Sequence, residues 1–146
     1  MKIDLLNRKI LKCLQENARM SNAEIGRQVG VSSPAVAERM RKMEDSGLIN
    51  GYKTVVSPFE AGYQLKAIII LRAFMGKLKP FLEKVKEYDE VLNCYRITGN
   101  ENIIMEVVLE NQKHLESFID QLIIYGETKT QIVLSHIIAN RAIKPV

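Results

Sequence analysis

The stretch Ser21–Leu48 constrains the fold most, because its residues predict two short helices joined by a tight turn. Ser21 and Glu24 stand at the S-x-x-E spacing of a capping box, which predicts that a helix begins at the next residue, Asn22. Gly30 is the residue type that most often ends a helix in a left-handed conformation. The first helix is therefore expected over residues 22–29.

A second helix is predicted directly after this turn. Ser32 or Ser33 can cap it, and Pro34 suits the first helical position because its missing N–H would have no partner there. Gly47 is expected to end the helix. Apolar residues recur at the spacing of one helical face, at Val36, Met40 and Met43.

The outward face of the second helix is small near its start and mostly basic later. Small side chains allow close approach to base edges, while Arg and Lys reach phosphates or guanine. This is the helix-turn-helix layout, with the second helix as recognition helix; the alternative is a helical hairpin whose polar face is merely solvated. The candidate DNA contacts are Ser32, Ser33, Pro34, Ala35, Glu38, Arg39, Arg41 and Lys42.

A further helix is predicted before the hairpin, over Leu5–Asn17, with Asp4 as its cap. It is expected to pack across the other two and complete a three-helix unit. Arg39 lies away from the apolar stripe, so it is expected to contact DNA. The alternative for Arg39 is a salt bridge inside the domain, for instance to a carboxylate of the first helix.

The charge distribution agrees with a DNA-facing N-terminal half. The formal net charge of the 146 residues is +4. Residues 1–50 contain nine Lys and Arg against six Asp and Glu, whereas residues 51–146 contain twelve against eleven. The basic excess is small, but it belongs to the half that carries the helical hairpin.

The pattern changes after Leu48. Residues 49–57 contain β-branched and aromatic side chains and are predicted to be extended, as a wing strand or as a connecting strand. Residues 57–62 contain Pro and Gly and are predicted to be a linker. We therefore expect a helix-turn-helix domain of winged-helix type over residues 1–57 and a second domain over residues 58–146.

The second domain is predicted to have the order β-α-β-β-α-β, which is ferredoxin-like and makes the chain an α+β protein. The expected strands are 65–75, 91–98, 103–109 and 128–139, with helices over about 78–86 and after Asn111. Such a sheet leaves one face uncovered. Because the strand centres at 68–71 and Ile137–Ile138 are strongly apolar, a second sheet is expected to cover that face in a homodimer.

Several classes of function find no support in the residues. The sequence contains no catalytic Ser/His/Asp or Cys/His arrangement, phosphate-binding glycine loop or metal-ligand spacing, so we expect neither an enzyme nor a cofactor. Cys13 and Cys94 are predicted to be buried free thiols of a reducing compartment. Without a signal peptide or an apolar run of about 18 residues, no membrane contact and a cytoplasmic location are expected.

The whole chain resembles the Lrp/AsnC family of transcriptional regulators. The residues that carry the resemblance are Asp4–Leu11, Val31–Ser32, Glu38–Glu44, Gly47–Ile49 with Gly51–Tyr52, and Thr98–Gly99. The resemblance implies binding to double-stranded DNA as homodimers or larger even-numbered rings such as octamers, often with an amino acid as effector. It also implies an effector cleft between dimers, at positions that match Gly99, Asn102, Gln131, Ile132 and Val133 here.

One position departs from the family pattern. The family's turn typically carries an Asp where this chain has Asn102. A neutral amide holds a ligand's ammonium group less strongly than a carboxylate does, so a weak or absent response to simple amino acids is expected. The alternative is that residues 99–102 are only a hairpin turn, which Gly and Asn favour without any ligand.

Three other functions remain as alternatives. The first is a constitutive DNA-organising protein without an effector, and the second is a metabolic ligand-binding protein whose helical domain is a dimer arm. The third is RNA binding, because RNA-recognition domains share the β-α-β-β-α-β order. Residues 103–109 contain no aromatic side chain, however, and so lack the usual base-stacking signature.

Overall fold

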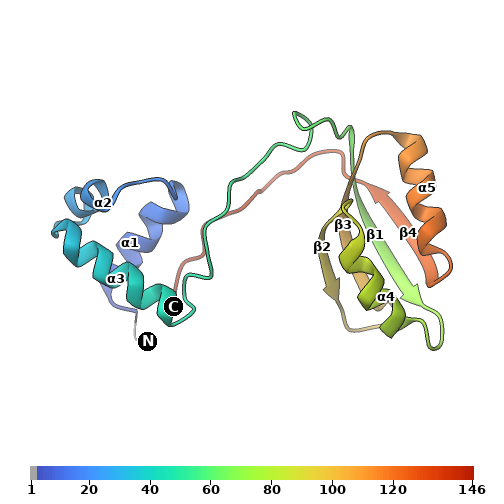
Figure 1. Cartoon of the computed structure of the whole chain (residues 1–146), viewed down its shortest axis with the longest axis horizontal. Coiled ribbons are helices and arrows are strands. Elements are labelled where there is room, and N and C mark those ends of the chain that lie inside the picture. Colours follow the sequence, from blue (N-terminus) through green and yellow to red (C-terminus); the bar gives the residue numbers. More distant parts are fainter. Residues whose placement is uncertain (1–2) are drawn as a thin grey trace. The chain divides into compact units, whose positions relative to one another are not determined.

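The computed structural model describes residues 3–146. The chain divides into two compact units, which are described separately below (Figure 1). The helical unit extends through Val55 and also includes Ile138–Val146, and the sheet unit is Val56–Ile137. The division after Val55 lies close to the expected boundary at residue 57, but the C-terminal segment, which the sequence assigned to the second domain, belongs to the first unit.

The helical unit contains α1 (Leu5–Glu16), α2 (Asn22–Val29) and α3 (Ser33–Asp45). The predicted caps are confirmed. The Asp4 carboxylate accepts a hydrogen bond from the backbone N–H of Asn7, and Ser21 and Glu24 form the capping box of α2. Of the two candidate serines, Ser32 caps α3.

The core of this unit consists of one face from each helix. Its fully buried side chains come from α1, α2 and α3 and are Ile10, Ile25, Val36 and Met43. Gly47 has a φ of 72°, and the backbone N–H groups of Leu48 and Ile49 both donate to the carbonyl of Met43. This reversal ends α3 and returns Leu48 to the core, as the residue types predict.

Residues 49–57 contain no strand. Both predicted alternatives, a wing strand and a connecting strand, are therefore wrong for these residues, which connect the two units without regular secondary structure. The Tyr52 hydroxyl donates a 2.8 Å hydrogen bond to Glu44, which attaches the start of this segment to the end of α3. Partial burial raises the pKa of Tyr52 to about 12, and the Glu44 carboxylate adds to this shift.

The sheet unit has the predicted ferredoxin-like order. Its strands are β1 (Leu65–Ala73), β2 (Val91–Arg96), β3 (Ile103–Leu109) and β4 (Gly126–Ile132). They form one antiparallel sheet in the order β2-β3-β1-β4. The connections contain α4 (Leu78–Lys84), the short 3₁₀ turn η1 (Val85–Glu87) and α5 (Gln112–Leu122).

Alternation along β1 separates the two faces of the sheet. Ala67, Ile69 and Leu71 are completely buried, and they share a core with Phe81 of α4 and Phe118 of α5. The opposite face carries Ile68 and Ile70 at the centre and is not covered by any described helix. The structure therefore shows the open face that the sequence predicted.

Two details of the sequence prediction are wrong. The last strand ends at Ile132, so Ile137 and Ile138, expected in its centre, are 87% and 53% exposed outside the sheet. Cys94 is also exposed, whereas Cys13 is buried as predicted. Cys94 lies on the edge strand β2, and Ile137 and Ile138 lie beyond the end of β4, so the sheet covers none of these side chains.

Neither cysteine forms a disulfide. No helix within residues 3–146 combines the length and the apolar character needed to cross a membrane.

The close approach of α2 to the following turn generates the first prediction. A Cβ added at Gly26 would lie 2.5 Å from the carbonyl oxygen of Val31. At an exposed position inside a helix, replacing Gly by Ala raises the free energy of unfolding by about 1 kcal/mol. Because the clash is with backbone, Gly26→Ala is instead expected to lower the free energy of unfolding by about 1–3 kcal/mol.

Urea denaturation followed by circular dichroism measures this effect. Arg27→Ala, at the exposed neighbouring position, serves as the control and should change the stability by less than about 0.5 kcal/mol. A more stable Gly26→Ala protein would contradict the proposed packing constraint.

Candidate functional site

The start of α3 presents small side chains on its surface. Ser32, Pro34 and Ala37 are exposed, and Ser33 and Ala35 are half-buried. The Ser32 hydroxyl accepts a hydrogen bond from the backbone N–H of Ala35, so it also serves as the helix cap. The side chains of Ser32–Ala35 are all short, so this end of the helix can approach a flat or grooved surface closely.

Arg39 is held inside its own domain. Its guanidinium Nη1 donates to Asp4 at 2.7 Å and to the Asn7 side-chain oxygen at 2.8 Å. Asn7 is only 5% exposed, so this hydrogen bond connects a buried side chain in the first turn of α1 to the middle of α3. Arg39 therefore forms a salt bridge inside the domain, which is the alternative that the sequence analysis set against direct DNA contact.

The Asp4 carboxylate responds to this arrangement. Its pKa is lowered, first by the hydrogen bond from the backbone of Asn7 and then by the one from Arg39. A carboxyl group whose pKa is lower in the folded state contributes stability above its unfolded pKa, and this contribution is lost as the pH falls through the folded value. The contact between α1 and α3 is therefore expected to weaken only below about pH 4.

Arg41 and Lys42 form a second, looser set of ion pairs. Arg41 contacts Glu38 at 3.0 Å and Asp45 at 2.8 Å, and Lys42 contacts Glu38 at 3.3 Å. All four side chains are about half exposed or more. Exposed pairs of this kind contribute little stability, so both cations can leave them for another anion.

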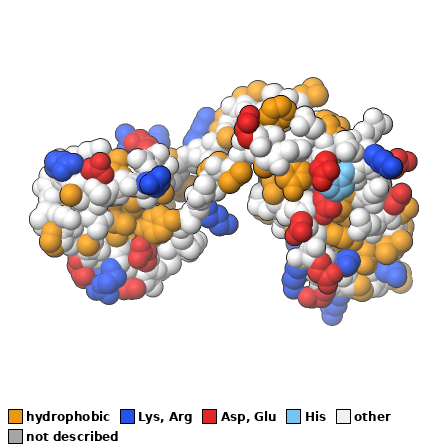
Figure 2. Space-filling view, turned by 45° about the horizontal axis from the view of Figure 1, so that its top comes forward, with side chains coloured by type: hydrophobic (Ala, Val, Ile, Leu, Met, Phe, Trp, Pro, Cys, Tyr) orange, Lys and Arg blue, Asp and Glu red, His pale blue; other side chains and the backbone are white. Residues whose placement is uncertain are grey.

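As a whole, α3 is electrically balanced, because three basic and three acidic side chains lie within Ser33–Asp45. The visible face of the helical unit likewise shows blue and red side chains interspersed (Figure 2). Interaction with a polyanion therefore depends on exchanging carboxylates for phosphates at particular side chains and not on a continuous basic patch.

The second candidate site lies on the open side of the sheet, at the turn between β2 and β3. Asn102 fixes this turn through three hydrogen bonds. Its side-chain oxygen accepts from the backbone N–H of Ala73 at 2.7 Å, its own N–H donates to Leu71, and its carbonyl accepts from Ile97. The amide that sequence reasoning assigned to a ligand therefore already has a structural partner at the end of β1.

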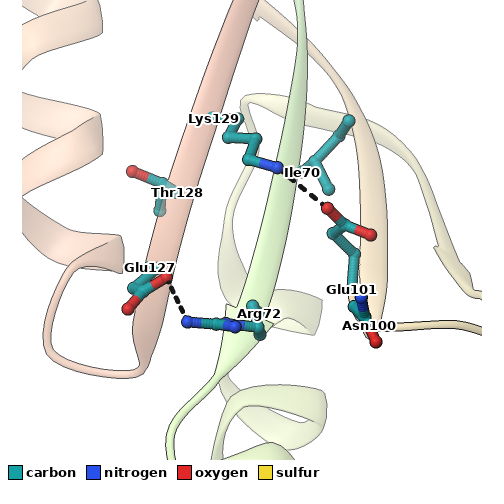
Figure 3. Close-up of a pocket in the computed structure, with 7 residues that line it drawn as sticks. All are labelled: Ile70, Arg72, Asn100, Glu101, Glu127, Thr128 and Lys129. Carbon is teal, nitrogen blue, oxygen red and sulfur yellow. Dashed lines mark hydrogen bonds and ion pairs between the residues drawn. The ribbon is translucent and has the colours of Figure 1, made fainter.

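A cleft of about 260 Å³ lies beside this turn (Figure 3). Two ion pairs line it. Arg72 contacts Glu127 at 2.6 Å, and Lys129 contacts Glu101 at 2.9 Å. The pKa of Glu101 is lowered, chiefly by the hydrogen bond from Lys129. The remaining lining residues are Ile70, Asn100 and Thr128.

Within one chain, the predicted effector residues fall into two groups. Gly99 and Asn102 belong to the turn that borders the cleft. Gln131 and Ile132 pair with Ile68 and Ala67, toward the other end of β1, and Val133 follows β4 with its N–H bonded to Lys66. A single chain therefore does not bring Gln131, Ile132 and Val133 next to the turn.

Sequence reasoning missed the charged side chains of the cleft. Arg72, Glu127 and Lys129 alternate along paired strands, so they share one face, but their pairing partner was not known from the sequence alone. Asn7 was also missed, although an Asn inside an apolar helical face is itself a signal of a buried hydrogen bond. No metal-binding cluster of His, Cys, Asp or Glu occurs within residues 3–146.

A three-helix unit whose α3 follows a tight turn, joined to a ferredoxin-like domain, is the architecture of a class of DNA-binding transcriptional regulators. Comparison with known families agrees: the AsnC-type helix-turn-helix domain matches residues 3–44, and the Lrp/AsnC ligand binding domain matches residues 66–143. The chain belongs to the Lrp/AsnC family of transcriptional regulators.

Individual relatives support this assignment along most of the chain. An uncharacterized HTH-type transcriptional regulator of Bacillus subtilis, YezC, is 35% identical over 87% of this chain and 90% of its own. HTH-type transcriptional regulator Ptr1 of Methanocaldococcus jannaschii is 32% identical over 83% and 82%. The residues matched include both units.

Solved structures give the same result. The structure of E. coli AsnC is 35% identical, with a TM-score of 0.87 over 99% of this chain and 100% of that one. A transcriptional regulator of Neisseria meningitidis, solved as an L-Met complex, has a TM-score of 0.92 over 97% and 96%. At 24% identity, the second comparison supports the fold alone.

The contact between α1 and α3 generates the second prediction. Asn7→Ala removes the acceptor that Arg39 uses within the domain and is expected to lower the free energy of unfolding by about 1–3 kcal/mol, because a hydrogen bond to a charged group is lost at a buried position. Chemical denaturation measures the change. Asn50→Ala, at an exposed position, is the control and should leave the stability nearly unchanged. Equal effects of the two substitutions would contradict the assigned role of Asn7.

Proposed function

We propose that this regulator binds duplex DNA by placing the start of α3 in the major groove. The observation that carries the proposal is the combination of an uncovered first turn with two cations, Arg41 and Lys42, whose only partners are exposed carboxylates. Small residues at the tip permit approach to bases, and the cations supply phosphate contacts. The proposed contacts are Ser32, Ser33, Pro34, Ala35, Arg41 and Lys42, whereas Glu38 is proposed to compete with phosphate for the two cations.

Arg39 has a different part in this proposal. If Arg39 moved to a phosphate, it would break its hydrogen bonds to Asp4 and Asn7. The buried side-chain oxygen of Asn7 would then have no partner, which costs more free energy than breaking an exposed ion pair. Arg39 therefore sets the position of α3 on α1, and its loss reduces DNA binding only through the domain's structure.

The third prediction concerns the two exposed cations. Arg41→Ala and Lys42→Ala should each weaken binding to all duplex sequences and reduce the slope of log affinity against log salt by about 1, because each removes one phosphate contact. Fluorescence anisotropy with a duplex from the protein's own promoter region measures both quantities. Lys113→Ala, an exposed lysine on α5, is the matched control and should change neither. Equal binding of single-stranded DNA or RNA would contradict duplex recognition.

Glu38 provides a sharper test of the same interface. Its pKa is lowered by hydrogen bonds from Arg41 and then Lys42, so it is charged at neutral pH and competes with phosphate for both cations. Glu38→Gln is expected to raise affinity several-fold for all duplexes. If the affinity instead falls only for the preferred duplex, then Glu38 accepts a hydrogen bond from a base. That result would contradict the proposal that Glu38 competes with phosphate for Arg41 and Lys42.

We further propose that two copies pair through the open faces of their sheets. Ile68, Ile70 and Ile104 lie at the centre of this face, next to the exposed Tyr95 of β2. The Lys66–Glu106 pair, 4.0 Å apart, borders these apolar side chains. An apolar centre with a charged border is typical of a self-complementary interface. Larger even-numbered rings, such as octamers, are the extension that the family resemblance implies.

The fourth prediction tests this interface. Ile104→Lys places a charge at the centre of the open face and should convert the dimer to monomers, because an unpaired charge cannot be buried there without a large cost. Light scattering of the full-length protein at micromolar concentration measures the mass. Glu116→Lys, on the exposed side of α5, is the control for introducing a lysine. A wild-type monomer, or a dimer that survives Ile104→Lys, would contradict the proposal.

The cleft at the turn is proposed to bind a zwitterion such as an amino acid. Arg72 and Lys129 can receive a carboxylate, while Glu101 and Glu127 can receive an ammonium group. These side chains now neutralise one another, so a ligand must replace existing ion pairs, and weak binding follows. The L-Met complex of the Neisseria meningitidis regulator shows such a ligand on this fold. Gln131, Ile132 and Val133 join the same cleft only if a neighbouring copy supplies them.

The fifth prediction is a calorimetric titration with a panel of amino acids. Glu101→Gln should weaken binding, because it removes a carboxylate of the cleft. Asn102→Asp should strengthen binding of at least one amino acid, because it adds charge while keeping an acceptor for Ala73. If neither variant differs from the wild type, these residues do not control recognition. If no amino acid binds any of the three proteins, the constitutive DNA-organising alternative is favoured.

A further inference from the structure

The last residues of the chain contact the first helix. Ile138–Val146 belongs to the helical unit although it follows the sheet in sequence, and it contains no helix or strand. The Gln15 side chain makes two hydrogen bonds to one residue of this segment. Its Nε2 donates to the carbonyl of Ile143 at 3.0 Å, and its Oε1 accepts from the Ile143 N–H at 2.7 Å. One amide therefore satisfies both backbone groups of Ile143, as a neighbouring strand would.

An apolar groove lies beside this pair of hydrogen bonds. It has a volume of about 410 Å³ and is bordered by Ile143 and Pro145 from the C-terminal segment. Pro145 is half-buried, and it has no N–H that would need a partner there. The domain contributes mainly apolar side chains from α1 and from the residues after α3, including Leu11, Leu14, Leu48, Ile49 and Tyr52.

We propose that the chain's own C-terminal segment, residues 141–146, docks as a peptide on α1 of the helix-turn-helix domain and forms one side of this groove. The hydrogen bonds to Ile143 set which residue docks, and half-buried Pro145 provides the apolar contact, whereas Ile143 is 78% exposed. This inference depends only on contacts within the helical unit. It can therefore be tested independently of the proposals for DNA binding and for the effector cleft.

Charge does not explain the docking. Lys144 lies near Arg8 and Lys12 of α1, where only Glu16 offers an opposite charge. The interaction therefore depends on the amide hydrogen bonds and on apolar contact, and raising the salt concentration should not release the segment. A segment held by ion pairs would instead be released as the salt concentration rises.

Docking gives the chain a second connection between its two units. The first is the segment that follows Val55, and the second is the stretch between β4 and the docked residues. A unit attached at two points has fewer accessible orientations than one attached by a single linker. In addition, β4 contributes Thr128 and Lys129 to the cleft before it leads into the docked segment.

Hydrogen exchange of the full-length protein, measured by mass spectrometry, tests the proposal. In the wild type, the C-terminal peptide that contains Ile143 should exchange more slowly than an unstructured peptide, in low and in high salt. Gln15→Ala should increase its exchange about tenfold, the effect expected for losing two neutral hydrogen bonds. Gln121→Ala, an exposed glutamine on α5, is the matched control and should have no effect. Trypsin cleavage after Arg141 gives a second readout and should accelerate in the same variant only.

A second variant separates docking from folding. Gln15→Glu keeps an acceptor for the Ile143 N–H but removes the donor to its carbonyl, so an intermediate exchange rate is expected while the peptides of α1 keep their protection. The proposal is overturned if the wild-type segment exchanges like a free peptide, or if Gln15→Ala leaves it unchanged. Protection that disappears on dilution to monomers would show that the segment comes from another copy, which also overturns the assignment to the same chain.

Discussion

The structure of the DNA-binding unit depends on the close backbone approach between α2 and the turn that precedes α3. The carbonyl of Gly26 accepts the N–H groups of Gly30 and Val31, and the missing side chain of Gly26 leaves room for the Val31 carbonyl. Ser32 then caps α3 immediately. These bonds fix the short connection between α2 and α3. They therefore fix the orientation of α3 about its own axis, which determines which of its side chains face outward. Arg39 adds a contact from the middle of α3 to α1, so the recognition helix is held at both its start and its centre.

Both candidate sites use charge in the same way. On α3 the cations Arg41 and Lys42 share Glu38, and in the cleft Arg72 and Lys129 each have a carboxylate partner. Exposed ion pairs contribute little to folding, so a phosphate or a zwitterion can replace one partner with a small net cost. Such sites bind weakly unless geometry adds several contacts at once. In the proposed dimer, two copies would present two recognition helices, and in a larger assembly a neighbour could add residues to the cleft, so binding at both candidate sites would depend on assembly.

Features set by local chemistry could be predicted from the sequence, and features set by distant partners could not. The caps at Asp4, Ser21 and Ser32 and the bounds of β3 follow from neighbouring residues, and they are confirmed. Arg39 could not be assigned, because Asp4 and Asn7 lie more than thirty positions away in sequence. The charged cleft required the register of β4 on β1, which turns Arg72 and Glu127 toward each other. The exposure of Cys94 reflects its place on an edge strand, which residue type alone does not reveal, and the apolar residues after Ile132 gave no sign that β4 ends there.

Coupling between the cleft and the DNA-binding unit requires an element with two arrangements, because a ligand shifts an equilibrium only by its different affinities for two states. Exchange of the ion pairs in the cleft is local and cannot by itself report to α3. The chain, however, continues from Lys129 through the end of β4 to the segment that Gln15 binds on α1. In the proposed docking, two neutral hydrogen bonds hold the segment and contribute about 1–3 kcal/mol, so a released form would be close to the docked form in free energy. If the proposed cleft binds a ligand, this segment is the candidate for the element with two arrangements, because the contact of Arg39 with the buried Asn7 and with Asp4 involves charged groups and costs more to break.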